Sequence, residues 1–206
     1  MVWHNYNIEK DFEKTFDEIY KKIDYKQSID DNRSERSYVL FKIAKELSSI
    51  NADFVECGPY AGISSYYMAK NCRTTLHLFD SWEGVSEVGE LDNEFYNIFK
   101  FDKVKIEDTQ KNLKDFKNIK YYKGWIPDRF NEVENLKFSL VHIDLDLYKP
   151  TLDSISFFWP RVVGGGVMIC DFHHGVSTGA QKATLEYFNG IINVEIHPSG
   201  IAIIRK

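Results

Sequence analysis

The sequence predicts an α/β protein with a mainly parallel sheet, two helices before it and a hairpin at its end. Short apolar or β-rich runs alternate with helical segments through most of the chain, which is typical of a parallel sheet covered by helices on both faces. These runs are short and apolar, as expected of strands buried on both sides. The last two runs are separated only by a Pro-Ser-Gly turn signal, which predicts a terminal hairpin.

The first fifty residues predict a helical extension. Two apolar stripes at helical spacing carry this prediction: Ile8, Phe12, Phe16, Ile19 and Ile23, then Val39, Ile43, Leu47 and Ile50. The polar stretch SIDDNRSER, residues 28–36, is predicted to be a break between them. The first helix, at 8–23, could pack against a partner chain instead of its own sheet, so a homodimer is one arrangement the sequence allows.

The remaining elements follow in order along one domain, residues 1–206. The predicted strands are FVEC, LHLF, IKYY, FSLVHI and GVMIC, followed by the hairpin runs INVEIHP and GIAIIRK. The predicted helical segments are SSYYMAKN, VKIEDTQKNLKDF, PTLDSISFFWP and TGAQKATLEYFNG. Residues 83–102 are acidic, aromatic and without a clear period, and they follow a strand end, where open α/β sheets bind ligands. We predict a substrate-covering loop there, with an ordinary surface insertion as the alternative.

Composition narrows the class of partner. A formal charge of -5 gives no electrostatic support to nucleic-acid binding. No run approaches the ~20 apolar residues of a membrane helix, and the start of the chain has no apolar signal segment, so a cytoplasmic protein is expected. Three cysteines, Cys57, Cys72 and Cys170, lack CxxC spacing and are predicted to be buried free thiols.

A glycine turn after the first strand predicts a nucleoside site. In FVECGPYAGIS, Gly58 and Gly62 allow a tight turn and close approach of a ligand, and the following helix begins with free amides. The spacing differs from the GxGxxG dinucleotide fingerprint, which disfavours an NAD-dependent oxidoreductase. Glu56 suits a ligand that carries positive charge. Asp80, at the end of the second strand, can accept hydrogen bonds from a ribose diol, although each signal alone also has a purely structural explanation.

Acidic and imidazole side chains gather at two later strand ends. Asp144 and Asp146 follow one strand, and Asp171, His173 and His174 follow the next. Residues i and i+2 of an extended chain point the same way, so both aspartates could reach one divalent cation. Carboxylates favour magnesium, whereas imidazoles favour zinc, manganese or iron, and the mixture leaves the metal open. Hydrogen bonding within a loop is the alternative for each residue.

The blocks VECGPYAGIS, LFDSWEG, YYKGWIPD, VHIDLDLYKPTLDSI and GGGVMICDF occur in this order over about residues 53–189. This order resembles the class I S-adenosylmethionine-dependent methyltransferases, most closely the macrocin and mycinamicin O-methyltransferase family. The resemblance implies a Rossmann-like, doubly wound, seven-stranded sheet that binds S-adenosylmethionine at its carboxyl edge. It also implies magnesium that positions a substrate hydroxyl, on a sugar of a glycosylated natural product or a surface polysaccharide.

The resemblance also implies roles for individual residues. Glu56 and Gly58 would lie near the methionine part of the cofactor and Asp80 at its ribose. The full set of expected cofactor contacts is Glu56, Gly58, Tyr60, Gly62, Ser64, Asp80, Ser81, Gly124, Trp125 and Asp144. Trp125 is predicted mainly to fill the core, with ligand contact as the alternative.

The expected metal ligands are Asp144 and Asp171. The family usually has a second acidic or amide residue directly after the second of these, and this chain has Phe172 there. Either His173 or Asp146 substitutes, or metal binding is weakened or absent. Methyl transfer also needs a base for the acceptor's proton. We expect it among His173, His174 and Asp146; His142 is less favoured because it lies within a strand.

Two other classes of function remain open on the sequence. Asp144-Leu145-Asp146 is a DxD element of the kind that holds a metal and a sugar nucleotide in glycosyltransferases. The departure at Phe172 would also suit a non-catalytic cofactor-binding protein. Trp82, Phe95, Tyr96 and Phe99 are predicted either to stack on a sugar acceptor or to anchor the 83–102 segment.

Overall fold

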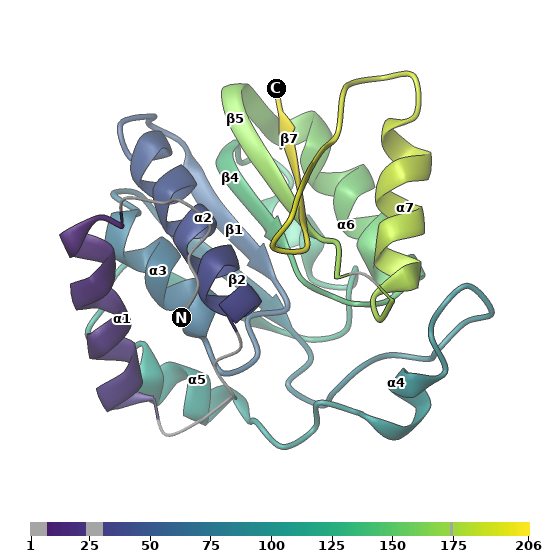
Figure 1. Cartoon of the computed structure of the whole chain (residues 1–206), viewed down its shortest axis with the longest axis horizontal. Coiled ribbons are helices and arrows are strands. Elements are labelled where there is room, and N and C mark those ends of the chain that lie inside the picture. The colour runs from purple at the N-terminus through teal and green to yellow at the C-terminus, as the bar shows by residue number, and fades with distance from the viewer. Residues whose placement is uncertain (1–7, 24–30, 174) are drawn as a thin grey trace.

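A seven-stranded sheet forms the centre of the protein (Figure 1). The computed structural model describes residues 8–23, 31–173 and 175–206, with backbone alone at 31–34. The strand order is β3-β2-β1-β4-β5-β7-β6, with β7 antiparallel to both β5 and β6 and the other pairs parallel. The strands are β1 Asp53–Cys57, β2 Leu76–Asp80, β3 Ile119–Lys123, β4 Phe138–Ile143, β5 Val162–Asp171, β6 Glu195–His197 and β7 Ile201–Arg205. The predicted doubly wound sheet and terminal hairpin are therefore confirmed.

Helices cover both faces of the sheet. Figure 1 shows α1, α2 and α3 on one face and α6 and α7 on the other. The described α-helices are α1 Lys10–Lys22, α2 Asp31–Leu47, α3 Ile63–Asn71, α4 Phe95–Ile98, α5 Ile106–Asn112, α6 Tyr148–Phe158 and α7 Thr178–Phe188, with short 3-10 helices at Phe130–Val133 and Trp159–Arg161. Each predicted helical segment has a helix within it or overlapping it.

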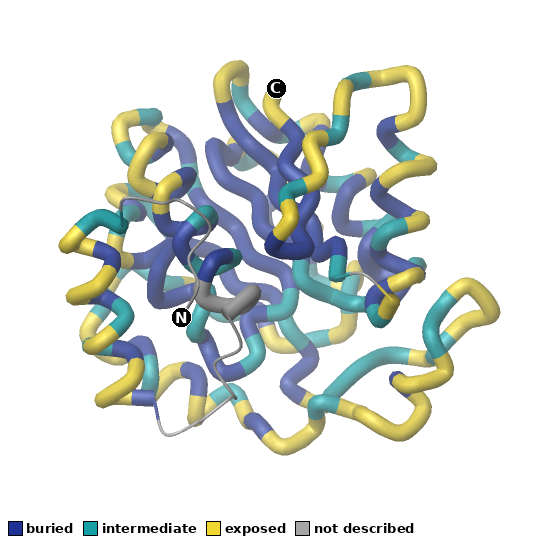
Figure 2. The backbone as a smooth tube through the Cα atoms, in the orientation of Figure 1, coloured by how far each residue is buried: buried dark blue, intermediate teal, exposed yellow. Residues whose placement is uncertain are grey.

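Each face of the sheet has its own apolar core. Alternate residues of a strand point to opposite faces, so Val167 and Ile169 of β5 join the core under α1 to α3, whereas Met168 and Cys170 join the core under α6 and α7. Figure 2 shows the central strands as buried along most of their length. The sheet is therefore a rigid platform whose strand ends hold the site.

The first helix packs on its own chain. Phe12 is 1% exposed, and its ring stacks on Tyr67 of α3 at a centroid distance of 5.3 Å. It also meets Tyr38 and Phe41 of α2 edge-on, at 5.0 and 5.6 Å. The two predicted amino-terminal helices are present, and the apolar side of α1 is covered by α2 and α3.

The predicted break at 28–36 is wrong from residue 31 onward, because α2 begins at Asp31; residues 24–30 lie outside the described part. Polarity suggested a loop here, yet Glu35 and Arg36 lie in the first turns of the helix and their side chains are buried or partly buried. Glu35 and Arg36 therefore direct their polar side chains toward the interior of the protein.

Two further expectations concern the cysteines and the membrane. Cys57, Cys72 and Cys170 are free and buried, as predicted. Burial raises the pKa of the Cys57 and Cys170 thiols well above their usual value, which keeps them protonated and unreactive. Among the described helices, none has both the length and the apolar character that crossing a bilayer requires.

Candidate functional site

A cavity of about 680 Å³ opens at the carboxyl ends of β1, β2, β4 and β5. This volume is within the range of small-molecule sites, roughly 300–1,000 Å³. The residues that line it and bear on the argument are Arg36, Gly58, Tyr60, Ser64, Asp80, Ser81, Phe95, Tyr96, Phe99, Trp125, His142, Asp144, Asp146, Asp171, His173 and Ser177. Most of the predicted site residues therefore share one cavity.

The turn after β1 joins two strand ends closely. Gly58 has φ +88°, and a Cβ atom built on it would lie 2.0 Å from the carbonyl oxygen of Asp144. Glycine is therefore required at this position by the neighbouring strand end as well as by its backbone angle. Gly62 caps α3 at φ +84° and packs beside Leu113 but does not line the cavity. Its role in the structure is local, in contrast to the expected ligand contact.

Asp80 is placed to receive hydrogen bonds from a ligand. Its Oδ2 accepts the backbone N–H of Tyr60 at 3.2 Å and its Oδ1 accepts that of Trp82 at 2.7 Å. Burial raises the pKa of this carboxyl, and the two N–H donors partly offset that effect. Each carboxylate oxygen retains a second lone pair for a donor in the cavity. Ser64, in the first turn of α3, lines the same side.

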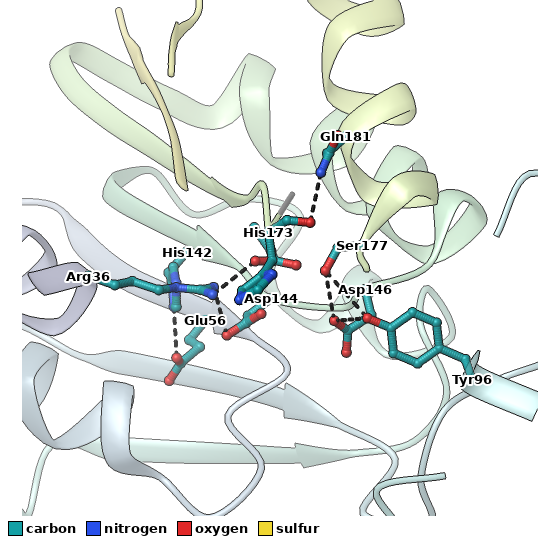
Figure 3. Close-up of polar contacts among 10 residues, drawn as sticks. Arg36, Glu56, Tyr96, His142, Asp144, Asp146, His173, Ser177 and Gln181 are labelled. Atoms are coloured by element: carbon teal, nitrogen blue, oxygen red, sulfur yellow. Dashed lines mark hydrogen bonds and ion pairs between the residues drawn. The ribbon is translucent and has the colours of Figure 1, made fainter. Parts of the chain in front are cut away.

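Glu56 does not line the cavity, although the sequence suggested that it contacts the cofactor. The side chain is fully buried, and one carboxylate oxygen accepts a hydrogen bond from the Ser65 hydroxyl. The other oxygen lies 2.8 Å from His142 Nδ1 and accepts its hydrogen bond (Figure 3). His142 does line the cavity. The cost of burying the Glu56 carboxylate is thus met by the protein itself, and Glu56 orients the His142 ring.

Three carboxylates meet at the other end of the cavity. One oxygen from each of Asp144, Asp146 and Asp171 lies within 4.8 Å of the others. β4 ends at Ile143, and Asp146 has φ +61°, so a left-handed loop residue brings Asp146 back toward Asp144. The predicted convergence is present, but an extended strand is not what produces it.

Arg36 of α2 reaches into this cluster. Its Nη2 lies 3.1 Å from Asp144 Oδ2 and its Nη1 lies 2.9 Å from Asp171 Oδ1 (Figure 3). Burial alone would lower the pKa of Arg36, but the carboxylates of Asp144, Asp171 and Asp146 raise it above its usual value. Arg36 therefore supplies a permanent positive charge to the cluster. Burial raises the pKa of Asp171, and Arg36 acts against that rise.

Asp146 is held from the opposite side. Its Oδ1 accepts the hydroxyl of Tyr96 at 2.7 Å and that of Ser177 at 3.1 Å (Figure 3). Burial, followed by the charges of Asp171 and Asp144, raises the pKa of Asp146 to about 7, and the two hydroxyl donors limit the rise. Of the three carboxylates, Asp146 is the one without an ion pair to Arg36.

Of the two predicted histidines, the structure describes His173 but not His174. His173 lines the cavity, its backbone oxygen accepts a hydrogen bond from Gln181 at 2.8 Å, and its buried Nδ1 has no hydrogen-bond partner among the described residues. His174 lies outside the described residues. Phe172 is 3% exposed and belongs to the core under α6 and α7, so it adds nothing to the acidic cluster.

The 83–102 segment forms one wall of the cavity. Phe95 and Phe99 line it and are 45% and 44% exposed, and Tyr96 ties the segment to Asp146. Asn93 donates a hydrogen bond of 3.0 Å to the Gly175 carbonyl. Trp82, in contrast, is buried and donates from Nε1 to Thr109, so it anchors the chain and does not face a ligand.

Of the site residues predicted at the ends of β2 and β3, some line the cavity and others do not. Trp125 lines the cavity and is 40% exposed, so the prediction that it fills the core is wrong and the alternative of a cavity position holds. Gly124 pairs its N–H with the Asp80 carbonyl at 2.9 Å and does not line the cavity. Ser81 lines the cavity, but its hydroxyl donates to the Gly84 carbonyl at 3.0 Å.

Sequence reasoning missed Arg36 and ranked His142 low. The signal for Arg36 was indirect: several acidic residues predicted at one buried edge need a compensating cation, and the amino-terminal extension is rich in basic residues. His142 was set aside because it lies within β4. His142 is nevertheless the next-to-last residue of this strand, and this position brings it to the cavity.

The cluster does not fit a divalent metal together with Arg36. Three carboxylate oxygens at this spacing match a magnesium-like site by chemistry. The guanidinium, however, is already within ion-pair distance of two of the three carboxylates, and Phe172 stands where the resemblance expects another oxygen ligand. The charge that a metal would supply is thus supplied by a side chain.

The strand order, the glycine turn, the acidic end of β2 and a cavity across the carboxyl edge define the Rossmann-like fold of the class I methyltransferases. Comparison with known families agrees with this class. Residues 38–194 match the family model described as macrocin-O-methyltransferase (TylF), and the chain belongs to that family.

Individual relatives are distant. The chain is similar to demethyldecarbamoylnovobiocin O-methyltransferase of Streptomyces niveus, with 23% identity over 140 residues, which cover 60% of this chain and 53% of the relative. It therefore spans about half the length of that curated relative. A structure titled as the O-methyltransferase NovP superimposes with a TM-score of 0.67 at 17% identity, covering 83% of this chain and 79% of the other. The calicheamicin methyltransferase CalS11 gives 0.63 at 13% identity, covering 100% and 98%.

Proposed function

We propose that this chain is an S-adenosylmethionine-dependent O-methyltransferase that methylates a sugar hydroxyl of a glycosylated natural product or surface polysaccharide. The observation that carries the proposal is the single cavity that joins a nucleoside-type half to an acidic half. The family match supports methyl transfer, and the names of the relatives, which concern novobiocin and calicheamicin, support a natural-product acceptor. The glycosyltransferase and non-catalytic alternatives gain no support from these comparisons.

The residues of the nucleoside-type half fit the cofactor. Asp80 is a desolvated carboxylate whose remaining lone pairs suit two ribose hydroxyl donors, and such donors would relieve the cost of its burial. Tyr60 and Ser64 line the cavity from the turn after β1 and from the first turn of α3, where the backbone N–H groups of a helix lack partners within the helix. Bound S-adenosylmethionine would supply an electrophilic methyl group on a sulfonium centre.

The residues of the acidic half fit a hydroxyl acceptor. Asp144 and Asp171 are paired with Arg36, so the guanidinium engages one oxygen of each carboxylate. Asp146 has no such pair, and its two hydroxyl donors both use Oδ1, which leaves Oδ2 as an acceptor. Asp146 is therefore the proposed general base: it accepts the proton that the hydroxyl loses as its oxygen is methylated. His173 is the alternative base.

The 83–102 segment is the proposed acceptor lid. Phe95 and Phe99 present half-exposed rings to the cavity, and aromatic faces suit the apolar face of a sugar. Tyr96 ties this segment to the proposed base through its hydroxyl. Acceptor binding and orientation of Asp146 would then depend on one segment.

Calorimetry and labelled methyl transfer test the proposal together. We expect the protein to bind S-adenosylhomocysteine, to show no comparable heat with nucleotide sugars, and to transfer labelled methyl from S-adenosylmethionine to a glycosylated acceptor. Asp146→Asn should lower kcat by about 10²- to 10⁴-fold, the usual worth of a general base, with the affinity for S-adenosylhomocysteine retained.

The control is Asp115→Asn, the same chemical change at a carboxylate that is 50% exposed and paired with Lys22. It should leave both binding and turnover unchanged. Absence of S-adenosylhomocysteine binding by the intact protein would refute the proposed function. Full activity of Asp146→Asn together with an inactive His173→Gln variant would move the base to His173.

A further inference from the structure

We infer that the Arg36 guanidinium is the resident cation of the acidic cluster, standing where the resemblance expects a divalent metal, and that the site works without metal. The statement about metal binding rests on the geometry of the cluster alone. The statement that turnover is metal-independent also rests on the proposed function.

Arg36 lies between two of the three carboxylates. Arg36 comes from α2, outside the sheet, yet its two terminal nitrogens lie 2.9 Å from the carboxylate of Asp171, the last residue of β5, and 3.1 Å from that of Asp144, which follows β4 (Figure 3). The side chain of Arg36 is 18% exposed and that of Asp171 is 1% exposed, so this contact is largely shielded from water. A forked guanidinium bridges two carboxylates with a geometry that one ammonium group does not offer.

The positive charge of Arg36 also disfavours a metal ion in the cluster. The buried Asp171 carboxylate lies against the Arg36 guanidinium, whose positive charge is the largest of the interactions that offset the burial of Asp171. A divalent ion bound by Asp144 and Asp171 would occupy the space beside these same oxygens and would meet the full positive charge of Arg36. At so short a distance, like charges in a poorly hydrated site repel strongly. The guanidinium and a metal therefore exclude one another.

The oxygen ligands that a metal would need are partly engaged or missing. Asp146 is the third carboxylate of the cluster, but its Oδ1 is engaged by Tyr96 and Ser177. Phe172 turns into the core and offers no oxygen. The replacement of an oxygen ligand by Phe172 and the presence of Arg36 are independent features of the chain, and both reduce the cluster's capacity for metal.

The consequence for the reaction concerns the acceptor. Arg36 lines the cavity, so its positive charge lies on the surface that a bound acceptor would meet. A guanidinium stays charged at all physiological pH values and cannot be removed by a chelator. Arg36 would thus hold Asp144 and Asp171 in place and favour negative charge that develops on the acceptor oxygen.

Mn²⁺ binding followed by electron paramagnetic resonance tests the inference directly, with thermal unfolding as a second readout. Wild-type protein should bind no Mn²⁺ at this site below millimolar concentration. Arg36→Met removes the charge while keeping an unbranched chain, and its Mn²⁺ Kd should be at least about tenfold lower than that of wild type. Mn²⁺ should also raise the Tm of this variant, because an ion that binds only the folded state stabilises it.

Two further variants separate charge from general damage. Arg36→Lys keeps one positive charge and should still exclude Mn²⁺. Arg205→Met makes the same change at an arginine that is 52% exposed and pairs with Glu46, and it should behave as wild type. If Arg36→Met does not fold, the wild-type titration and Arg36→Lys still decide the question.

The outcomes are distinct. Wild-type binding of Mn²⁺ at micromolar concentration, or a folded Arg36→Met that binds no more Mn²⁺ than wild type, would overturn the inference. So would methyl transfer that is lost after chelation and restored by Mg²⁺. Failure to bind S-adenosylhomocysteine would instead overturn the proposed function and leave the assignment of the cation intact.

Discussion

Asp80 provides the sharpest test of where the cofactor lies. Its two oxygens each accept one backbone N–H, from Tyr60 and Trp82, and each keeps one lone pair for a ligand. Asp80→Asn replaces one oxygen by an NH₂ group, so one ligand hydrogen bond to a charged acceptor is lost. Such a bond is worth about 1.5–3 kcal/mol, which corresponds to roughly 10- to 150-fold in Kd. We expect that loss in the affinity for S-adenosylhomocysteine, measured by calorimetry.

The effect on folding should be small by comparison. One backbone N–H loses its acceptor, which is unfavourable, but burial already disfavours the charged form of Asp80, as its raised pKa shows, and asparagine removes that cost. The free energy of unfolding should therefore change by less than about 2 kcal/mol.

Asp53→Asn is the matched control for this experiment. Asp53 lies at the opposite end of β1 and accepts the N–H of Thr75 at 3.0 Å, so the chemical change is similar but remote from the cavity. It should not alter cofactor affinity. Unchanged affinity of Asp80→Asn would refute the reasoning that puts the ribose at this carboxylate.

Three predictions concern stability, each measured by denaturant unfolding. Gly58→Ala should lower the free energy of unfolding by at least about 3 kcal/mol, because a clash with the Asp144 carbonyl adds to the strain of a positive φ. Gly190→Ala, at φ +70° with open space around it, should lower it by about 1 kcal/mol. Equal losses would contradict the close approach of the two strand ends. Phe12→Ala should cost about 3–5 kcal/mol and Tyr20→Ala, at a side chain 61% exposed, less than about 0.5 kcal/mol; a small loss for the first would mean that α1 is not part of the core. Burial lowers the pKa of His77, so the folded state binds a proton on this ring less readily than the unfolded state does. The free energy of unfolding should therefore fall as pH drops below 6.5, by at most about 1.4 kcal/mol per pH unit. His77→Gln should flatten this pH dependence, and a variant with the same pH profile as wild type would contradict the prediction.

The fold was largely predictable because its signals are local. Runs such as FSLVHI and GVMIC are apolar over the length of a buried strand, and each lies within one strand of the sheet. The hairpin was marked by its own turn residues. The start of α2 was mispredicted because polarity was equated with exposure, whereas the polar side chain of Arg36 is directed to partners at the sheet edge.

The site was predictable where strand order sufficed. Asp80, Asp144 and Asp171 each end or follow a parallel strand, so topology alone brings them to one edge. What each side chain contacts depends on packing that no local pattern encodes. Glu56 pairs with His142 on a neighbouring strand, and Trp125 faces the cavity.

The position of Arg36 also bears on how this protein can be shortened. The stretch that matches the family model begins at residue 38, two positions after the guanidinium that balances Asp171. A chain trimmed at its amino-terminal side to residue 38 would retain every strand and the glycine turn after β1, yet would leave the buried Asp171 carboxylate without its counter-ion. Trimming at that boundary would also remove Arg36 from the wall of the cavity.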